Sequence, residues 1–114
     1  MNDEIYSIGD QFGDYSVSNY GNVINKKTGV MKSQHFDKTN GTLCVTLFKD
    51  YKKRNVAVHR LVAMAFVDNP HYCNQVTHKD KNKRNNHYTN LEWSMAKHAS
   101  PQPSYHPKYF TLFY

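Results

Sequence analysis

Alternating apolar and polar residues predict short strands in the first half of the chain. Tyr15 and Val17 alternate with serines, and Val23 resumes the apolar pattern a few residues later. Residues 19–22, which separate these stretches, are rich in asparagine and include a glycine, so they predict a turn. A second turn is expected at residues 26–29, where Lys-Lys-Thr-Gly follows the strand pattern.

A longer strand is expected at residues 43–48, where leucine and valine alternate with cysteine, threonine and phenylalanine. The basic stretch 50–55 is then expected to close a hairpin, and Val56 and Val58 to begin its returning strand. Together these stretches predict a small antiparallel sheet in the first half of the chain.

The apolar period changes after the hairpin and predicts a helix over residues 59–66. The members of its apolar stripe are Leu61, Val62, Ala65 and Phe66. We expect Asn69 and Pro70 to end the helix, because a residue that precedes proline avoids helical geometry.

The second half continues with short elements. Residues 76–77 predict a brief strand, residues 79–89 a long polar loop, and residues 91–95 a second strand. A further helix could begin at residues 96–100, although the prolines that follow exclude a long regular helix. Residues 101–114 form a tail rich in proline and aromatic residues, which could dock on the sheet or on a partner.

Length and charge narrow the class of protein. A chain of 114 residues predicts one domain, and a hydrophobic fraction of 39% allows only a modest core. The formal charge of +6 is concentrated in two basic clusters, at residues 49–54 and 79–84. One explanation is a solvated basic face. Contact with nucleic acid is favoured, because both clusters lie beside aromatic or histidine-rich segments.

Other classes of protein are not indicated. The chain contains no apolar run near the roughly 20 residues of a membrane span, and its N-terminus lacks a signal-peptide pattern. We therefore expect a soluble intracellular protein with no membrane partner. The histidines and cysteines do not have the spacing of a structural zinc site.

The segment from His78 to Trp93 carries the most specific chemistry. Hydrolysis of a phosphodiester needs a base that activates water, a divalent cation, and cationic groups that hold the phosphates. His78 is a candidate base, and the lysines and arginine of the same segment supply the cations. The same segment does not plainly supply the ligands of a divalent cation.

Three segments, in order along the chain, carry a family resemblance: residues 15–23, 58–70 and 76–93. Together they resemble a phage-type HNH homing endonuclease, of the group whose motif ends in Asn-Leu-Glu-Trp. The first segment resembles the modular DNA-binding motif that often precedes this nuclease. The second resembles the linking helix, and the third resembles the nuclease core. The resemblance covers roughly residues 5–100.

The resemblance implies an α+β fold, in which a small antiparallel β-sheet plus a helix is followed by a ββα-metal (HNH) unit. It implies a small antiparallel β DNA-binding motif at residues 1–57 and the linking helix and HNH nuclease unit at residues 58–100. The proline- and aromatic-rich tail at residues 101–114 follows these units. It also implies a cytoplasmic protein in a bacterial host.

The same resemblance implies roles for individual residues. His78 would be the general base that takes a proton from the attacking water, and Asn90 would bond loop backbone and so orient His78. The family's metal ligands fall at Thr77 and Ala99, where aspartate, asparagine or histidine is usual. Threonine is a weak ligand and alanine is none, but a one-residue shift of the helix could offer His98. The implied cofactor is a divalent metal, Mg²⁺ first, with Mn²⁺ or another transition metal as the alternative.

Double-stranded DNA is the implied partner. The cations expected on its phosphates are Arg54, Arg60, Lys81, Lys83 and Arg84. Arg60 could instead form a salt bridge with Glu92 or Asp80, and the sequence leaves these alternatives open. Trp93 is expected to pack in the core rather than on a base, and Asp80 to cap the loop through its carboxylate.

The leading interpretation is metal-dependent endonucleolytic cleavage, in the form of nicking, of double-stranded DNA. One alternative is a catalytically inactive DNA-binding protein derived from such a nuclease, and another is a phage protein-interaction module that uses the aromatic tail. Ala99 is either an engineered change that disarms the metal site or the mark of a naturally decayed or repurposed copy. The sequence does not define the target site or the oligomeric state.

Overall fold

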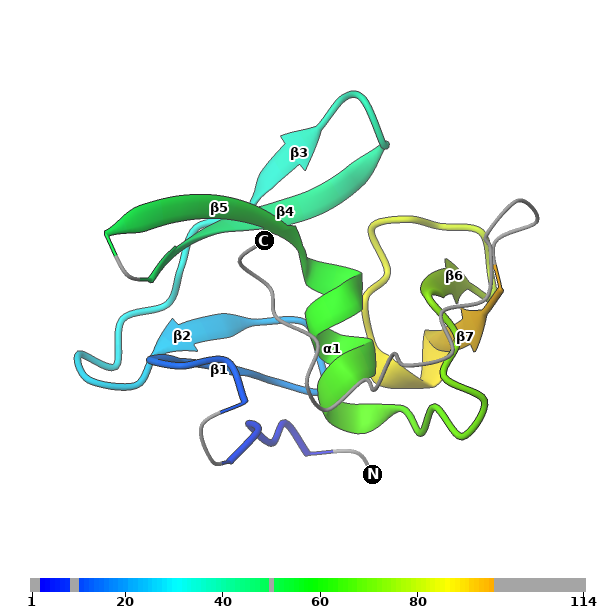
Figure 1. Cartoon of the computed structure of the whole chain (residues 1–114), viewed down its shortest axis with the longest axis horizontal. Helices are drawn as coiled ribbons and strands as arrows, with labels where there is room; N and C mark the ends of the chain where they lie inside the picture. The colour runs from blue at the N-terminus through cyan, green and yellow to red at the C-terminus, as the bar shows by residue number, and fades with distance from the viewer. Residues whose placement is uncertain (1–2, 9–10, 50, 96–114) are drawn as a thin grey trace.

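A computed structural model describes residues 3–8, 11–49 and 51–95 of the chain. Its elements are β1 (Tyr15–Val17), β2 (Val23–Asn25), β3 (His35–Asp37), β4 (Thr42–Lys49), β5 (Lys52–Ala57), α1 (Val58–Phe66), β6 (Gln75–His78), the 3₁₀ helix η1 (Tyr88–Asn90) and β7 (Leu91–Ser94). In this described part, three small antiparallel sheets and one α-helix confirm the expected α+β class (Figure 1). The predictions for residues 96–114 lie outside it.

Each sheet forms between strands that are adjacent in sequence. β1 pairs with β2 across a turn at residues 18–22. β4 is the centre of a three-stranded sheet, with β3 on one side and β5 on the other. β6 and β7 form a hairpin in which Val76 is paired with Trp93 and Thr77 with Glu92. None of the helices in the described residues is long and apolar enough to cross a membrane.

The hairpin of β4 and β5 corrects two predicted bounds. The sequence predicts a connection over residues 50–55, but β5 already begins at Lys52, which is paired with Lys49. The first four residues of β5 are exposed, so their polar side chains face solvent while their backbone completes the ladder. Val58, predicted in the returning strand, is the first residue of α1 and is buried.

The end of α1 agrees with the predicted helix range 59–66, whereas strand β3 was not expected from the sequence. α1 ends at Phe66, before Pro70 is reached, because Val67 is extended with φ −117° and ψ 122°. The Val67 N–H closes the helix by donating to the carbonyl oxygen of Ala63 at 3.0 Å. β3 was not predicted, since two of its three residues are exposed and it has no apolar alternation to mark it.

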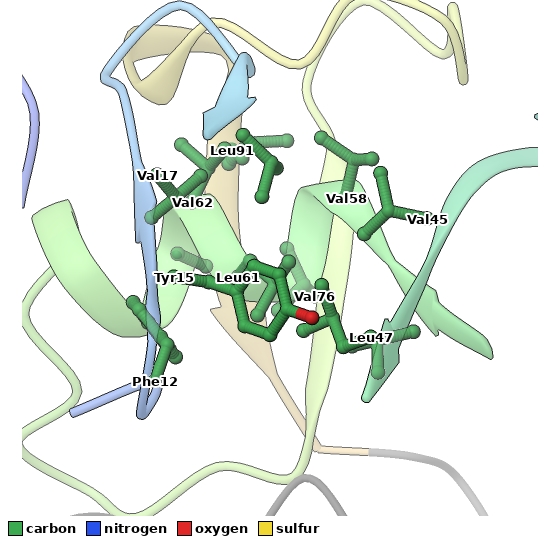
Figure 2. Close-up of a cluster of buried hydrophobic side chains, with 13 residues drawn as sticks. Phe12, Tyr15, Val17, Val45, Leu47, Val58, Leu61, Val62, Val76 and Leu91 are labelled. Carbon is green, nitrogen blue, oxygen red and sulfur yellow. The ribbon is translucent and has the colours of Figure 1, made fainter. Parts of the chain in front are cut away.

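The helix α1 is at the centre of the molecule and contacts β1, β4, β5, β6, β7 and η1 (Figure 1). Side chains from these elements meet in one hydrophobic cluster, in which Leu61 and Val62 of the helix are fully buried (Figure 2). Val17 and Leu47 contribute from the sheets, and Leu91 from the last hairpin. The predicted N-terminal motif and nuclease unit therefore share one core, and the boundary between them remains a prediction.

Candidate active site

The β6–β7 hairpin places His78 at the edge of the core. Val76 is buried on β6, and Leu91, the partner of His78 on β7, is 2% exposed. Trp93 packs against the core cluster, and its Nε1–H donates to the carbonyl oxygen of Val67 at 3.1 Å. The core position expected for Trp93 is thus confirmed, and the hairpin is anchored on both strands.

Asn90 holds the loop that connects the two strands. Its Oδ1 accepts from the backbone N–H of Asp80 at 3.1 Å, and its Nδ2 donates to the Asp80 carboxylate and to the carbonyl oxygen of Asn85, both at 2.9 Å. The Asp80 carboxylate also accepts from Asn85 and from the backbone of Asn82, and these hydrogen bonds lower its pKa. Asp80 caps the loop as expected, and Asn90 bonds loop backbone.

The direct hydrogen bond to the His78 ring comes from another residue. Oδ1 of Asn86 lies 2.8 Å from Nε2 of His78, and Asn86 is buried. The influence of Asn90 on His78 therefore passes through the loop, and its predicted catalytic role is untested. Sequence reasoning missed Asn86; the paired asparagines at residues 85–86 in the motif are the signal that could have indicated it.

His59 is a second residue of the site that the sequence did not single out. It follows the first residue of α1, and its ring lies 4.9 Å from the His78 ring, centroid to centroid. Burial, and then electrostatic interaction with His78, Arg60 and Lys83, lower the pKa of His59 to about 4. His59 is therefore neutral near pH 7. Its Nδ1 is buried and lacks a hydrogen-bond partner among the described residues.

A cleft of about 580 Å³ brings these groups together. Its lining residues are Asn40, Thr42, Ala57, His59, Gln75, Val76, Thr77, His78, Lys81 and Lys83. The lining thus comes from the turn between β3 and β4, strands β4 and β5, the start of α1, and strand β6 with its following loop. A cleft of this size that carries an imidazole and two ammonium groups can hold an anion beside a proton acceptor.

Three of the predicted DNA-binding cations lie on the loop after β6. Lys81 and Lys83 line the cleft, and Lys83 Nζ donates to the carbonyl oxygen of Asn40 at 3.1 Å. The guanidinium of Arg84 lies 4.4 Å from the centroid of the Phe36 ring, in a cation–π contact. These contacts join the loop to strand β3 and to the turn between β3 and β4.

The other two predicted DNA-binding cations lie outside the lining of the cleft. Arg60 Nη1 donates to the carbonyl oxygen of Asn74 at 3.0 Å, and its guanidinium lies 5.7 Å from the Trp93 ring centroid. Arg54 is exposed on β5, where it is paired with Leu47 of β4. Contact of these five cations with DNA remains a prediction, as does the salt bridge considered for Arg60.

The expected metal ligands are only partly within the described residues. Thr77 is half-buried, and its Oγ1 lies 3.5 Å from the carbonyl oxygen of Glu92. His98 and Ala99 lie outside the described part of the chain. Residues 3–8, 11–49 and 51–95 contain no group of three His, Cys, Asp or Glu side chains that could hold a metal ion. These residues alone therefore do not fit a Mg²⁺ site, which prefers carboxylate oxygens.

Comparison with known proteins shows what the chain is similar to. Residues 8–48 match the NUMOD4 motif. A solved structure concerned with DNA binding and cleavage by the HNH homing endonuclease I-HmuI matches with a TM-score of 0.69 and 37% identity, over 82% of this chain and 53% of the other. The chain is therefore related, in sequence and fold, to the HNH homing endonucleases.

Individual relatives are also HNH endonucleases. An uncharacterized HNH endonuclease of Acanthamoeba polyphaga mimivirus is 45% identical over 87 residues, which is 76% of this chain and 26% of the relative. The DNA endonuclease I-HmuI of Bacillus phage SP01 is 41% identical over 75% of this chain and 48% of its own length. The H-N-H endonuclease F-TflII of Escherichia phage T5 is 31% identical over 77% and 46%. The chain thus spans half or less of these curated relatives.

Proposed function

We propose that the chain binds double-stranded DNA and hydrolyses one of its strands by HNH-type chemistry. The observation that carries this proposal is the position of His78, which lies in a cleft with Lys81 and Lys83. The hydrogen bonds of Asn90 and Asp80 fix the loop that follows His78. The similarity to HNH endonucleases supports the same function.

In the proposed reaction, His78 takes a proton from a water molecule whose oxygen attacks the scissile phosphorus. A new P–O bond forms as the bond to the leaving oxygen breaks, and the leaving oxygen gains a proton from solvent. Lys81 and Lys83 would hold the non-bridging phosphate oxygens beside the imidazole. Lys83 would then exchange its hydrogen bond to the Asn40 carbonyl for one to phosphate.

A divalent metal is part of the proposal, with Mg²⁺ first and Mn²⁺ or another transition metal as the alternative. Thr77 would be one donor, and His98, outside the described residues, is the other candidate. The metal is implied by the resemblance of the sequence, whereas the donors in the described part do not define its site. The proton transfer and phosphate contacts above do not depend on which metal is used.

Nicking of supercoiled plasmid tests the proposal. We expect nicked circles when the chain is incubated with plasmid and Mg²⁺, Mn²⁺ or Ni²⁺, and intact plasmid when a chelator is present. Intact plasmid with every metal would contradict nuclease activity. Ala99→Asn should raise the rate if Ala99 disarms the metal site, and an unchanged rate would contradict that explanation.

DNA binding is tested separately by its dependence on salt. Each phosphate contact should contribute a slope of about −0.9 in log affinity against log salt concentration. Arg54→Ala is expected to weaken binding and to reduce that slope by about one contact. An affinity that does not change with salt would contradict phosphate contacts.

Catalytically silent DNA binding is the second candidate. It is favoured by Thr77, where the family pattern has a stronger ligand and where the structure shows only a hydroxyl beside the Glu92 carbonyl. Duplex binding in a gel-shift assay without nicking under any metal would support it. Absence of both binding and nicking would favour the protein-interaction module.

A further inference from the structure

Asn86 lies between His78, the proposed base, and the turn at residues 18–22, which belongs to the predicted N-terminal unit (residues 1–57). It is 6% exposed, and its Oδ1 lies 2.8 Å from Nε2 of His78. Its Nδ2 is buried and has no hydrogen-bond partner within the described residues. Burying an amide is unfavourable unless it forms hydrogen bonds, and the bond to His78 is the one that the structure shows for this side chain.

Hydrogen bonds fix the chain on both sides of Asn86. On one side, Nδ2 of Asn90 donates to the carbonyl oxygen of Asn85 at 2.9 Å. On the other side, the backbone N–H of Tyr88 donates to the carbonyl oxygen of Asn19 at 2.9 Å. Asn19 belongs to the turn between β1 and β2, so the N-terminal unit supports this part of the loop directly.

The turn at residues 18–22 approaches Asn86 closely at Gly21, whose positive φ also favours glycine. Gly21 has φ +96°, and a Cβ added there would lie 3.1 Å from the Cβ of Asn86 and 3.4 Å from its carbonyl oxygen. The turn is itself held in place. Ser18 Oγ accepts two backbone N–H groups of the turn at 3.1 Å, and Gln34 Nε2 donates to the Gly21 carbonyl oxygen at 2.6 Å.

We propose that Asn86 is a positioning residue for His78 and that the turn at residues 18–22 sets the position of Asn86. This inference rests on the proposed function, in which His78 is the base. An amide oxygen can only accept, so its contact with Nε2 places a hydrogen there and leaves the lone pair on Nδ1 for proton transfer. The N-terminal unit then supports the nuclease centre in addition to its proposed contact with DNA.

Nitrogen NMR of the histidine rings tests the contact directly. Two-bond ¹⁵N–¹H spectra of the neutral imidazoles, recorded on the whole chain without DNA or metal, show which nitrogen of His78 carries hydrogen; His78→Ala identifies its signals. We expect a protected Nε2–H in the wild type and in Asn86→Asp, which keeps an oxygen acceptor. In Asn86→Ala the protected signal should disappear and the Nδ1–H population should rise.

Two results would overturn the role of Asn86. One is an Nδ1–H tautomer of His78 in the wild type, and the other is an unchanged Nε2–H signal in folded Asn86→Ala. These spectra do not require cleavage. A chain that never nicks DNA but shows the expected spectra would contradict the proposed function and still support the position of Asn86.

Cleavage kinetics provide the functional readout. Asn86→Ala should lower kcat by about 10- to 100-fold, as removal of a partner that orients a metal-ligating histidine does, and leave the DNA dissociation constant unchanged. Asn86→Asp should recover most of the rate. A wild-type rate in Asn86→Ala, or a loss explained entirely by weaker DNA binding, would contradict the positioning role.

Two glycine variants test the turn. Gly21→Ala and Gly29→Ala both place alanine at positive φ (+96° and +73°), but a Cβ at Gly29 meets no atom within 4 Å. Gly21→Ala should therefore change the His78 signals as Asn86→Ala does, and Gly29→Ala should not. If Gly21→Ala does not fold, Gln34→Ala replaces it, because this variant removes the hydrogen bond from Gln34 to the Gly21 carbonyl oxygen that holds the turn. Unchanged His78 signals in the folded turn variant would overturn the role of the turn.

Discussion

Burial of His59 couples the stability of the protein to pH. The pKa of this imidazole is lowered to about 4 from the ordinary value of 6.5, chiefly by burial. Between these two values the unfolded chain binds a proton that the native chain does not. Stability should therefore be greatest above pH 6.5 and fall as the pH is lowered toward about 4.

His59→Gln tests this coupling. Urea unfolding of the wild type between pH 7.5 and pH 4.5 should show a slope that includes up to about 1.4 kcal/mol per pH unit from this residue. His59→Gln should lose that share of the slope, whereas His35→Gln, at an exposed position, should keep it. An identical slope in His59→Gln and the wild type would show that His59 is not buried in its neutral form.

Asn90 makes a separate prediction at the residue scale. Asn90→Ala removes three hydrogen bonds and leaves loop groups without partners, so the free energy of unfolding should fall by about 2 kcal/mol or more. Lys79→Ala, which changes an exposed neighbour, should have little effect. Thermal or urea unfolding measures both. A fully stable Asn90→Ala would mean that these hydrogen bonds do not hold the loop.

Sequence reasoning reached some of these residues and missed others for a physical reason. The motif placed His78 and Asn90, and the structure shows Asn90 bonding loop backbone as expected. Asn86 and His59 were missed because their importance arises from contacts between segments distant in the chain. Neither the approach of Gly21 to Asn86 nor the tilted ring contact of His59 with His78 leaves a periodic pattern.

At the scale of elements, the loop after β6 contacts strand β3 and the turn between β3 and β4. Lys83 donates to the Asn40 carbonyl, and Arg84 lies over the Phe36 ring. The strand β3 is exposed and was not predicted, yet it supports the cationic side of the cleft. A short exposed strand is defined by its backbone hydrogen bonds to a neighbouring strand, and the pattern of apolar and polar residues gives no information about those bonds. The same cause explains the wrong start of β5.

Phe36→Ala tests this connection. Removing the ring should loosen the loop, so the backbone amide of Asn85, which donates to the Asn82 carbonyl, should exchange with deuterium several times faster. Phe48→Ala, which removes another exposed aromatic ring, should leave that exchange rate near the wild-type value. Equal exchange in all three proteins would show that the Arg84–Phe36 contact does not order the loop.

At the scale of the molecule, one core serves both predicted units. Leu61 of α1 is 1% exposed and packs in the cluster that includes residues of β1, β4 and β7. Because the helix lies between the sheets, we expect the described part to unfold cooperatively.

Leu61→Ala tests the shared core. It should lower the free energy of unfolding by about 2–5 kcal/mol. Trp93 fluorescence, which reports the last hairpin, and far-ultraviolet circular dichroism should give the same midpoint in the wild type and the variant. Ile8→Ala, at a position 91% exposed, is the control and should change stability little. Separate midpoints for the two probes would indicate two independently folding units.

The most direct test of the account compares the wild type with His78→Ala, measuring duplex binding and strand cleavage in the same samples. We predict equal affinity for DNA, with metal-dependent nicking in the wild type and none in the variant. Nicking that continues in His78→Ala would contradict the assignment of His78 as the base.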